Sequence, residues 1–204
     1  MSNPFDYAAH VSRNTGYVSD DVQEKVRNTR LLIAGCGIGS SVAVCAARMG
    51  FQHFVLVDGD TVSAHNLNRQ FYNFADIGRT KVEALSDAIL AINPSATVER
   101  HIEYLTAENT AEIVDRSDII FDTVDFLDLA AIEGLHSAAR QQGKPIFTAL
   151  SVGFGALVWY FPADTQATLP SILAQHSPQI EGGGRDVGGS PDAAQAASAY
   201  ATVF

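Results

Sequence analysis

A short apolar run that turns directly into a glycine-rich loop constrains the fold of this chain more than any other feature. The run covers Leu31 to Ala34, the loop reads Gly35-Cys36-Gly37-Ile38-Gly39-Ser40, and a helical segment follows as far as Gly50. A second apolar run, Phe54 to Val57, then ends on Asp58. A strand, a glycine turn, a helix and another strand in this order predict two parallel strands of one sheet.

The same alternation continues along the chain, so we predict an α/β fold: a Rossmann-like, doubly wound, mostly parallel sheet with helices on both faces. Further helices are expected at 20–28, 81–92, 106–116 and 127–142, and further strands at 96–100, 119–121, 145–149 and 156–161. Residues 1–29 are expected to form an N-terminal arm, irregular up to residue 19, and a helix. Residues 30–162 would form the nucleotide-binding domain. Residues 163–204 would form an irregular loop and a short helical segment, 193–204, so that the end is short or truncated.

The bulk composition excludes several classes of protein. The 204 residues suffice for one domain with a full core, and no apolar run is long enough to span a bilayer. We therefore expect no membrane partner, and the polar N-terminus is unlike a signal peptide. Two cysteines, Cys36 and Cys45, are too few for a four-ligand zinc site and fit a reducing cytoplasm. A net charge of −10 argues against a nucleic-acid partner, which needs a basic patch.

The glycine loop has the composition of a phosphate-binding turn. Gly35, Gly37 and Gly39 let the backbone turn tightly and let a phosphate approach the amides of the next helix. Asp58 lies 23 residues after Gly35, the separation expected of an acid that binds a ribose. The alternative is that these glycines only permit close packing of the helix on the strand.

A second group of polar residues lies beyond two strand ends, where such sheets bind ligands. Asn66, Arg69, Gln70 and Lys81 follow the same strand as Asp58, and Asp125 follows a later strand. Asp58 suits a ribose, Arg69 and Lys81 suit phosphates, and Asp125 suits a metal beside them. Alternatively, Arg69 and Lys81 are solvated surface charges and Asp125 is a turn residue.

The string Asp58-x-Asp60-x-Val62-x-x-x-Asn66-Leu67-x-Arg69-Gln70, with Lys81 and Asp125 downstream, resembles the ThiF/MoeB-type adenylyltransferases, which are ubiquitin-activating-type enzymes. The resemblance covers roughly residues 10–162. It implies that ATP binds at the glycine loop and that a carboxylate attacks its α-phosphate to give an acyl-adenylate and pyrophosphate. By motif position, Asp58 would bind ribose, Asn66, Arg69 and Lys81 would contact phosphates, and Asp125 would hold Mg²⁺. Gly35, Gly37, Gly39, Asp60 and Gln70 would complete the nucleotide site of this adenylation domain.

The resemblance also implies a homodimer in which Arg13 of one arm reaches the partner's site. Alternatively, Arg13 is an arm residue without a role. The substrate would be the C-terminal carboxylate of a ubiquitin-like protein, a sulfur carrier or a peptide. The chemistry needs cations to offset phosphate charge but no general base, because a carboxylate is already ionised near neutral pH.

The chain departs from the family pattern in several places. The glycine loop is one residue shorter than the usual GxGGxG, and Phe126 follows Asp125 where an Asn is common. No cysteine follows Cys45, so we expect no thioester step, and no CxxC pair is present to bind zinc. The segment after the sheet, which would dock the substrate, is short.

Three hypotheses remain open from the sequence. The first is an ATP-dependent adenylyltransferase. The second is a non-catalytic relative that keeps the nucleotide fold as a binding or dimer partner, which the short tail and altered loop would fit. The third is an NAD-dependent oxidoreductase. Arg69 and Lys81 argue against it, because two cations favour a triphosphate ligand over NAD.

Overall fold

A computed structural model describes residues 5–152 and 155–176 of the chain, and within them six strands form one sheet in the order β3-β2-β1-β4-β5-β6. The strands are β1 (Arg30–Ala34), β2 (His53–Val57), β3 (Thr97–His101), β4 (Ile119–Asp122), β5 (Ile146–Val152) and β6 (Gly155–Phe161). The helices are α1 (Tyr7–His10), α2 (Asp20–Asn28), α3 (Gly39–Met49), α4 (Lys81–Ile92), α5 (Thr110–Asp115), α6 (Leu129–Gln141) and α7 (Leu169–His176). The first five strands are parallel and β6 is antiparallel, which confirms the predicted fold class.

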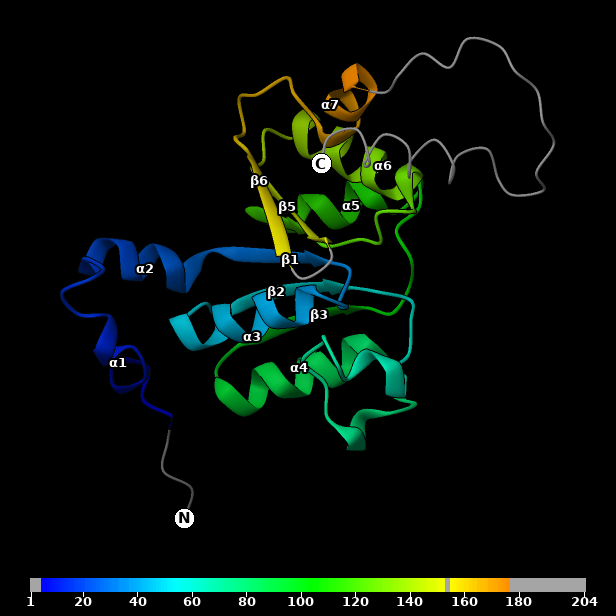
Figure 1. The fold of residues 1–204 in the computed structure, drawn as a ribbon. Coiled ribbons are helices and arrows are strands. Elements are labelled where there is room, and N and C mark those ends of the chain that lie inside the picture. The colour runs from blue at the N-terminus through cyan, green and yellow to red at the C-terminus, as the bar shows by residue number, and fades with distance from the viewer. Residues whose placement is uncertain (1–4, 153–154, 177–204) are drawn as a thin grey trace, which may run out of the picture.

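Helices cover both faces of the sheet (Figure 1). On one face α3 and α4 pack over Leu31, Ile33 and Leu56, and on the other α5, α6 and α7 pack over Leu32 and Val55. Because the central strands are buried on both sides, they read in the sequence as continuous apolar runs. Among the helices of the described residues, none is long and apolar enough to cross a membrane.

The strand order reverses direction at β1, which has β2 on one side and β4 on the other. Ala34 is in register with Val57 of β2 and with Asp122 of β4, so the three strands end level with one another. The loops that follow them meet at one edge, and this is where open α/β sheets bind ligands.

The N-terminal arm is more regular than the sequence predicts. Residues 1–19 were expected to be irregular, but they contain α1 and a 3₁₀ helix, Ser12–Asn14. The Asp6 side chain caps α1 by accepting a hydrogen bond from the amide of Ala9 (3.3 Å), and the Tyr7 hydroxyl donates to the carbonyl of Gly50 (2.9 Å). Contacts with the end of α3 therefore order the arm.

Two helices that follow β3 in the chain, α5 and α7, also differ from expectation. The helix expected at 106–116 begins only at Thr110, because residues 106–109 form a turn in which Asn109 Oδ1 accepts from the amide of Thr106. Helix α7 lies in a part expected to be irregular, and burial of Leu169 and Leu173 holds it against α6. The helix expected at 193–204 lies outside the described residues. The division at residues 29 and 162 stays a prediction.

Candidate active site

Asp58 connects the loop after β2 to the glycine loop after β1. Its Oδ2 accepts a hydrogen bond from the amide of Cys36 (2.7 Å), and its Oδ1 accepts from the amide of Asp60 (2.8 Å). Only 9% of the Asp58 side chain is exposed, and this burial raises the pKa of its carboxyl despite the nearby cation of Lys81. The carboxylate is thus fixed at the meeting point of two strand ends.

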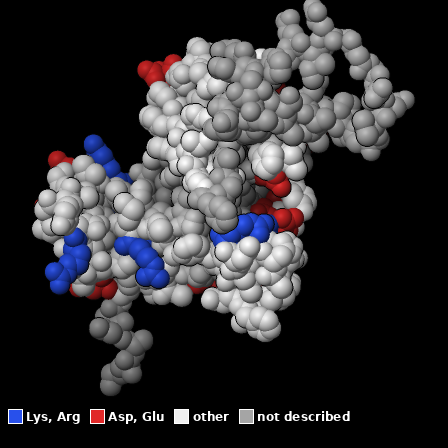
Figure 2. Space-filling model, viewed as in Figure 1, with Lys and Arg blue, Asp and Glu red and all other residues white. Residues whose placement is uncertain are grey.

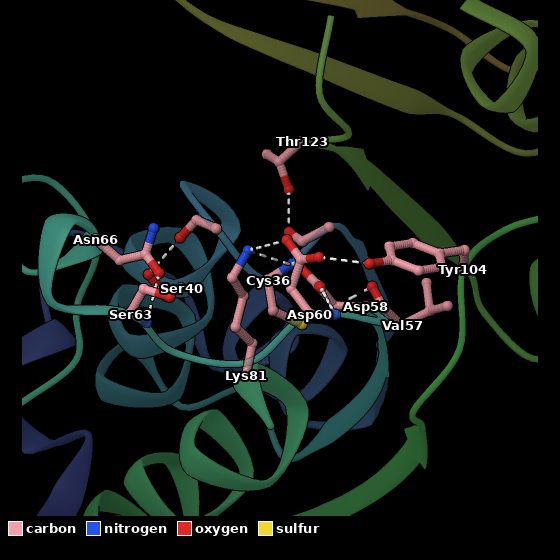
Figure 3. A network of polar contacts seen from close by, with 12 residues as sticks. Cys36, Ser40, Val57, Asp58, Asp60, Ser63, Asn66, Lys81, Tyr104 and Thr123 are labelled. Carbon is pink, nitrogen blue, oxygen red and sulfur yellow. Dashed lines mark hydrogen bonds and ion pairs between the residues drawn. The ribbon is translucent and has the colours of Figure 1, made fainter. Parts of the chain in front are cut away.

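Lys81 is the first residue of α4 and points toward these two acids (Figure 3). Its Nζ lies 2.6 Å from Oδ2 of Asp60 and 3.8 Å from Oδ2 of Asp58, and 8% of its side chain is exposed. The Thr80 hydroxyl caps the helix by accepting from the amide of Glu83 (3.3 Å), which fixes where the helix begins. A buried ammonium is therefore held at the same edge as Asp58.

Asp60 binds Lys81 through one oxygen and Tyr104 through the other. The Tyr104 hydroxyl donates to Oδ1 of Asp60 (2.6 Å). The hydrogen bonds from Lys81 and from Tyr104 lower the pKa of the Asp60 carboxyl. The sequence analysis missed Tyr104, whose only signal is an aromatic residue shortly after the end of β3.

The glycine loop packs closely against the end of β4. Gly35 has a φ of +87°, and a Cβ there would lie 2.5 Å from the carbonyl oxygen of Thr123. A Cβ on Gly39 would lie 2.5 Å from the Thr123 hydroxyl, which itself donates to the carbonyls of Ala34 (2.9 Å) and Gly35 (2.6 Å). Gly35 and Gly39 thus have the packing role that we considered as an alternative. Thr123 is a second residue that the sequence analysis missed.

Gly37 faces the Asn66–Gln70 segment across the site. A Cβ on Gly37 would lie 3.2 Å from Nε2 of Gln70, and the buried Oε1 of Gln70 has no hydrogen-bond partner among the described residues. The Ser40 hydroxyl donates to the carbonyl of Gly37 (2.6 Å) and accepts from the amide of Phe71 (2.9 Å). The segment that carries the family motif is therefore anchored at the start of α3, where the helix N-terminus favours an anion.

Asn66 and Arg69 make their described contacts within their own segment. Asn66 is buried, and its Oδ1 accepts from the amide of Ser63 (2.8 Å) across a 3₁₀ turn. Arg69 is exposed, and its Nη1 donates to the carbonyl of His65 (2.9 Å) and to Oδ1 of Asn68 (3.1 Å). Its guanidinium is thus accessible to a ligand. A solvated surface charge without a binding role would be equally accessible, so this exposure agrees with both hypotheses.

Asp125 makes no hydrogen bond or ion pair with Lys81 among the contacts of the described residues. Asp125 is exposed after β4, and its Oδ1 accepts from the amide of Leu127 (3.1 Å), as a turn residue does. A single carboxylate together with ligand phosphates fits the ordinary coordination of Mg²⁺. Within residues 5–152 and 155–176, no group of three or more His, Cys, Asp or Glu side chains could hold a metal alone.

Arg13 lies at the end of α3 that is opposite to the glycine loop. Its neighbour Asn14 donates to the carbonyl of Met49 (3.0 Å), whereas the loop meets the helix at Gly39. Eleven helical residues, or roughly 16 Å, separate the two ends. The structure therefore does not bring Arg13 to the site of its own chain.

A family model described as the ThiF family matches residues 11–187. The chain belongs to the ThiF family. It is 34% identical over 127 residues to the probable adenylyltransferase/sulfurtransferase MoeZ of Mycobacterium tuberculosis, covering 61% of this chain and 32% of MoeZ. It is 31% identical over 137 residues to the sulfur carrier protein ThiS adenylyltransferase of Escherichia coli, covering 66% of this chain and 54% of that protein. The chain thus spans between about a third and about a half of these relatives.

Solved structures share the ThiF-family fold. Escherichia coli MccB with ATP superposes with a TM-score of 0.71 at 23% identity, over 88% of this chain and 53% of that one. The tRNA N6-threonylcarbamoyladenosine dehydratase TcdA of Escherichia coli gives a TM-score of 0.66 at 23% identity, over 69% of this chain and 59% of that one. At this identity the likeness concerns the fold, and it agrees with the Rossmann-like sheet described above.

Proposed function

We propose that this chain is an ATP-dependent adenylyltransferase that activates a carboxylate as an acyl-adenylate and releases pyrophosphate. The observation that carries the proposal is the buried Lys81 ammonium beside Asp58, at the strand edge where the glycine loop opens α3. An acceptor for a ribose, a desolvated cation and a helix N-terminus at one edge suit a nucleoside triphosphate. The family match supports the same reading.

In the proposed reaction a carboxylate oxygen forms a bond to the α-phosphorus while the bond from that phosphorus to the bridging oxygen breaks. Pyrophosphate leaves with the electron pair. Lys81 and Arg69 offset the charge that builds on the phosphates, and Asp58 accepts hydrogen bonds from the ribose hydroxyls. Asn66, Gln70 and the glycine loop would line the phosphates, with Nε2 of Gln70 as the side-chain donor nearest to Gly37. Mg²⁺ bound to Asp125 and the phosphates would neutralise further charge.

We propose a protein or peptide C-terminus as the carboxylate, in particular that of a ubiquitin-like sulfur carrier. One relative is, by its name, the adenylyltransferase of the sulfur carrier protein ThiS. On the face shown in Figure 2, the Lys and Arg side chains of the described residues lie apart from one another rather than in one basic patch. Together with the net charge of −10, this disfavours a substrate borne on tRNA.

The cysteines argue against a thioester step after adenylation. Cys36 is buried, and burial raises the pKa of its thiol, so it is a poor nucleophile. Cys45 is exposed on α3, and no cysteine follows it in the sequence. Both thiols are free, as suits a reducing cytoplasm.

We also propose that the active form is a homodimer in which Arg13 serves the partner's site, because Arg13 lies at the wrong end of α3 to serve its own. An aromatic row on the sheet would suit burial by a second copy: Phe121, Phe147 and Tyr160 have ring centroids 5.3 and 4.6 Å apart, and Tyr160 is 56% exposed. Mixing inactive Arg13→Ala subunits with inactive Lys81→Met subunits should restore activity, since each mixed dimer holds one complete site. Unrestored activity in demonstrated mixed dimers would exclude this arrangement.

ATP–pyrophosphate exchange in the presence of peptides and small proteins that end in Gly-Gly tests the main proposal. The wild type should exchange label, Arg69→Ala should lose most of the activity, and Arg48→Ala, an exposed arginine on α3, should retain it. ATP binding without exchange for any carboxylate would instead support a non-catalytic relative. Stabilisation by NAD but not by ATP·Mg would support an oxidoreductase.

A further inference from the structure

Tyr104 is an exposed aromatic residue whose position is nevertheless fixed by three contacts. Its hydroxyl donates to Oδ1 of Asp60 (2.6 Å), and its carbonyl accepts from Nδ2 of Asn109 (2.9 Å). Its ring lies against Gly59, where a Cβ would come within 2.6–2.8 Å of three ring carbons. The residue is still 61% exposed. A flat apolar surface is thus held in one orientation and left open to solvent.

The position of this ring relates it to the proposed nucleotide site. The Tyr104 ring lies against Gly59, the residue between Asp58 and Asp60. Figure 3 shows the Tyr104 hydroxyl on the side of Asp60 that faces away from Lys81. In the proposed function Asp58 binds the ribose, and the base is attached directly to that sugar. A base leaving the ribose on the side away from the phosphates would meet the ring.

We propose that Tyr104 is the stacking platform for the base of the bound nucleotide, an assignment that rests on the proposed function. Aromatic side chains bind bases through their π-faces with little dependence on which base is present. Gly59 lies against the Cδ2, Cε2 and Cζ carbons of the ring, and the exposed part of the ring is the surface on which a base would stack. Asp60 holds the platform through the hydroxyl and, through its second oxygen, holds Lys81.

A purely structural role for Tyr104 makes a different prediction. If the residue acted only by binding Asp60, removal of the hydroxyl alone would have the full effect. If it acts as a platform, Tyr104→Phe should retain most nucleotide affinity because the ring stays, and Tyr104→Leu should lose it. Phe74→Leu is a control, since Phe74 is an aromatic residue that is 83% exposed and belongs to neither the proposed nucleotide site nor the proposed dimer interface.

Calorimetric titrations with ATP·Mg and with inorganic tripolyphosphate·Mg test the proposal, because tripolyphosphate fills the phosphate site without a base. Tyr104→Leu should raise the Kd for ATP about tenfold or more and leave the Kd for tripolyphosphate within about twofold of the wild type. Tyr104→Phe and Phe74→Leu should change either Kd by less than about threefold.

Three results would overturn the assignment while leaving the proposed function intact. They are an unchanged ATP affinity in Tyr104→Leu, an equal loss for ATP and tripolyphosphate, and an equal loss of ATP affinity in the Phe and Leu variants. A wild type that binds no ATP would instead overturn the proposed function, and the platform with it. Thermal unfolding of each variant shows whether it is folded.

Discussion

The Nζ of Lys81 lies 2.6 Å from Oδ2 of Asp60 and is almost completely buried at the first turn of α4. A desolvated ammonium in this position is stabilised by Asp60 and by the more distant carboxylate of Asp58. Because opposite charges interact strongly where water is excluded, the carboxylates of Asp58 and Asp60 are both stabilised by the Lys81 ammonium.

Replacement of Lys81 should therefore affect stability as well as nucleotide binding. Lys81→Met leaves Asp58 buried without a cation, and we expect the free energy of unfolding to fall by about 2–4 kcal/mol. The measurement is urea denaturation at neutral pH. Lys25→Met, an exposed lysine on α2, is the control and should change stability by less than about 0.5 kcal/mol. Equal stabilities for the two variants would show that the Lys81 ion pairs contribute nothing.

Asp58 and Asp60 should titrate on opposite sides of the ordinary Asp pKa of 3.8, because burial raises the pKa of Asp58 and hydrogen bonds lower that of Asp60. The contribution of Asp60 to the free energy of unfolding is complete above pH 3.8 and is lost as the pH falls through the lower pKa that Asp60 has in the folded protein. The contribution of Asp58 to the free energy of unfolding is complete below pH 3.8 and is lost as the pH rises through the raised pKa that Asp58 has in the folded protein. Carboxyl carbon NMR titrations of both residues, assigned with Asp→Asn variants, would contradict this if the order were reversed.

Two helical glycines should respond in opposite directions to alanine. A Cβ on Gly39 would lie 2.5 Å from the Thr123 hydroxyl and 2.6 Å from Cγ2 of Ile33, so Gly39→Ala should cost about 1–3 kcal/mol. In the part of the chain that the structure describes, no atom would lie within 4 Å of a Cβ on Gly134 in α6, so Gly134→Ala should stabilise by about 0.5–1 kcal/mol. Thermal and urea unfolding of both variants provide the comparison. A neutral Gly39→Ala would disprove the close approach to Thr123.

The Thr123 hydroxyl should support nucleotide binding without touching the nucleotide. Thr123→Val removes the hydrogen bonds to the carbonyls of Ala34 and Gly35 while keeping the shape, and should cost about 1–2 kcal/mol of stability. The loosened glycine loop should also weaken ATP binding. Thr123→Ser keeps the hydroxyl and should bind ATP like the wild type in calorimetry. If both variants bind ATP equally, the hydroxyl does not position the loop.

The sheet and the helix carrying Lys81 were predictable from the sequence because local signals determine them. The central strands are buried on both faces and so appear as apolar runs, and α4 spans the predicted residues since Thr80 caps its start and Asn93-Pro94 ends it. The alignment of Asp58 with the glycine loop followed from parallel strands ending together.

The contacts made across long separations could not be predicted in the same way. Tyr104 reaches Asp60 across 44 residues, and Thr123 reaches Ala34 across 89 residues, with no periodic pattern to indicate either contact. The position of Arg13 depends on where the arm docks on α3, which only tertiary packing decides. Helix α7 likewise depends on the burial of two leucines rather than on its own periodicity.

The transfer of ¹⁸O from a labelled carboxylate to AMP tests the central claim most directly, because it reports which bond forms. A Gly-Gly-terminated substrate that supports exchange would be labelled at its C-terminal carboxylate, incubated with ATP·Mg and the protein, and the adenylate hydrolysed at its acyl carbon. Attack of the carboxylate on the α-phosphorus predicts AMP that carries one ¹⁸O, together with one pyrophosphate per AMP. Unlabelled AMP, or ADP and phosphate as the products, would contradict carboxylate adenylation at this site.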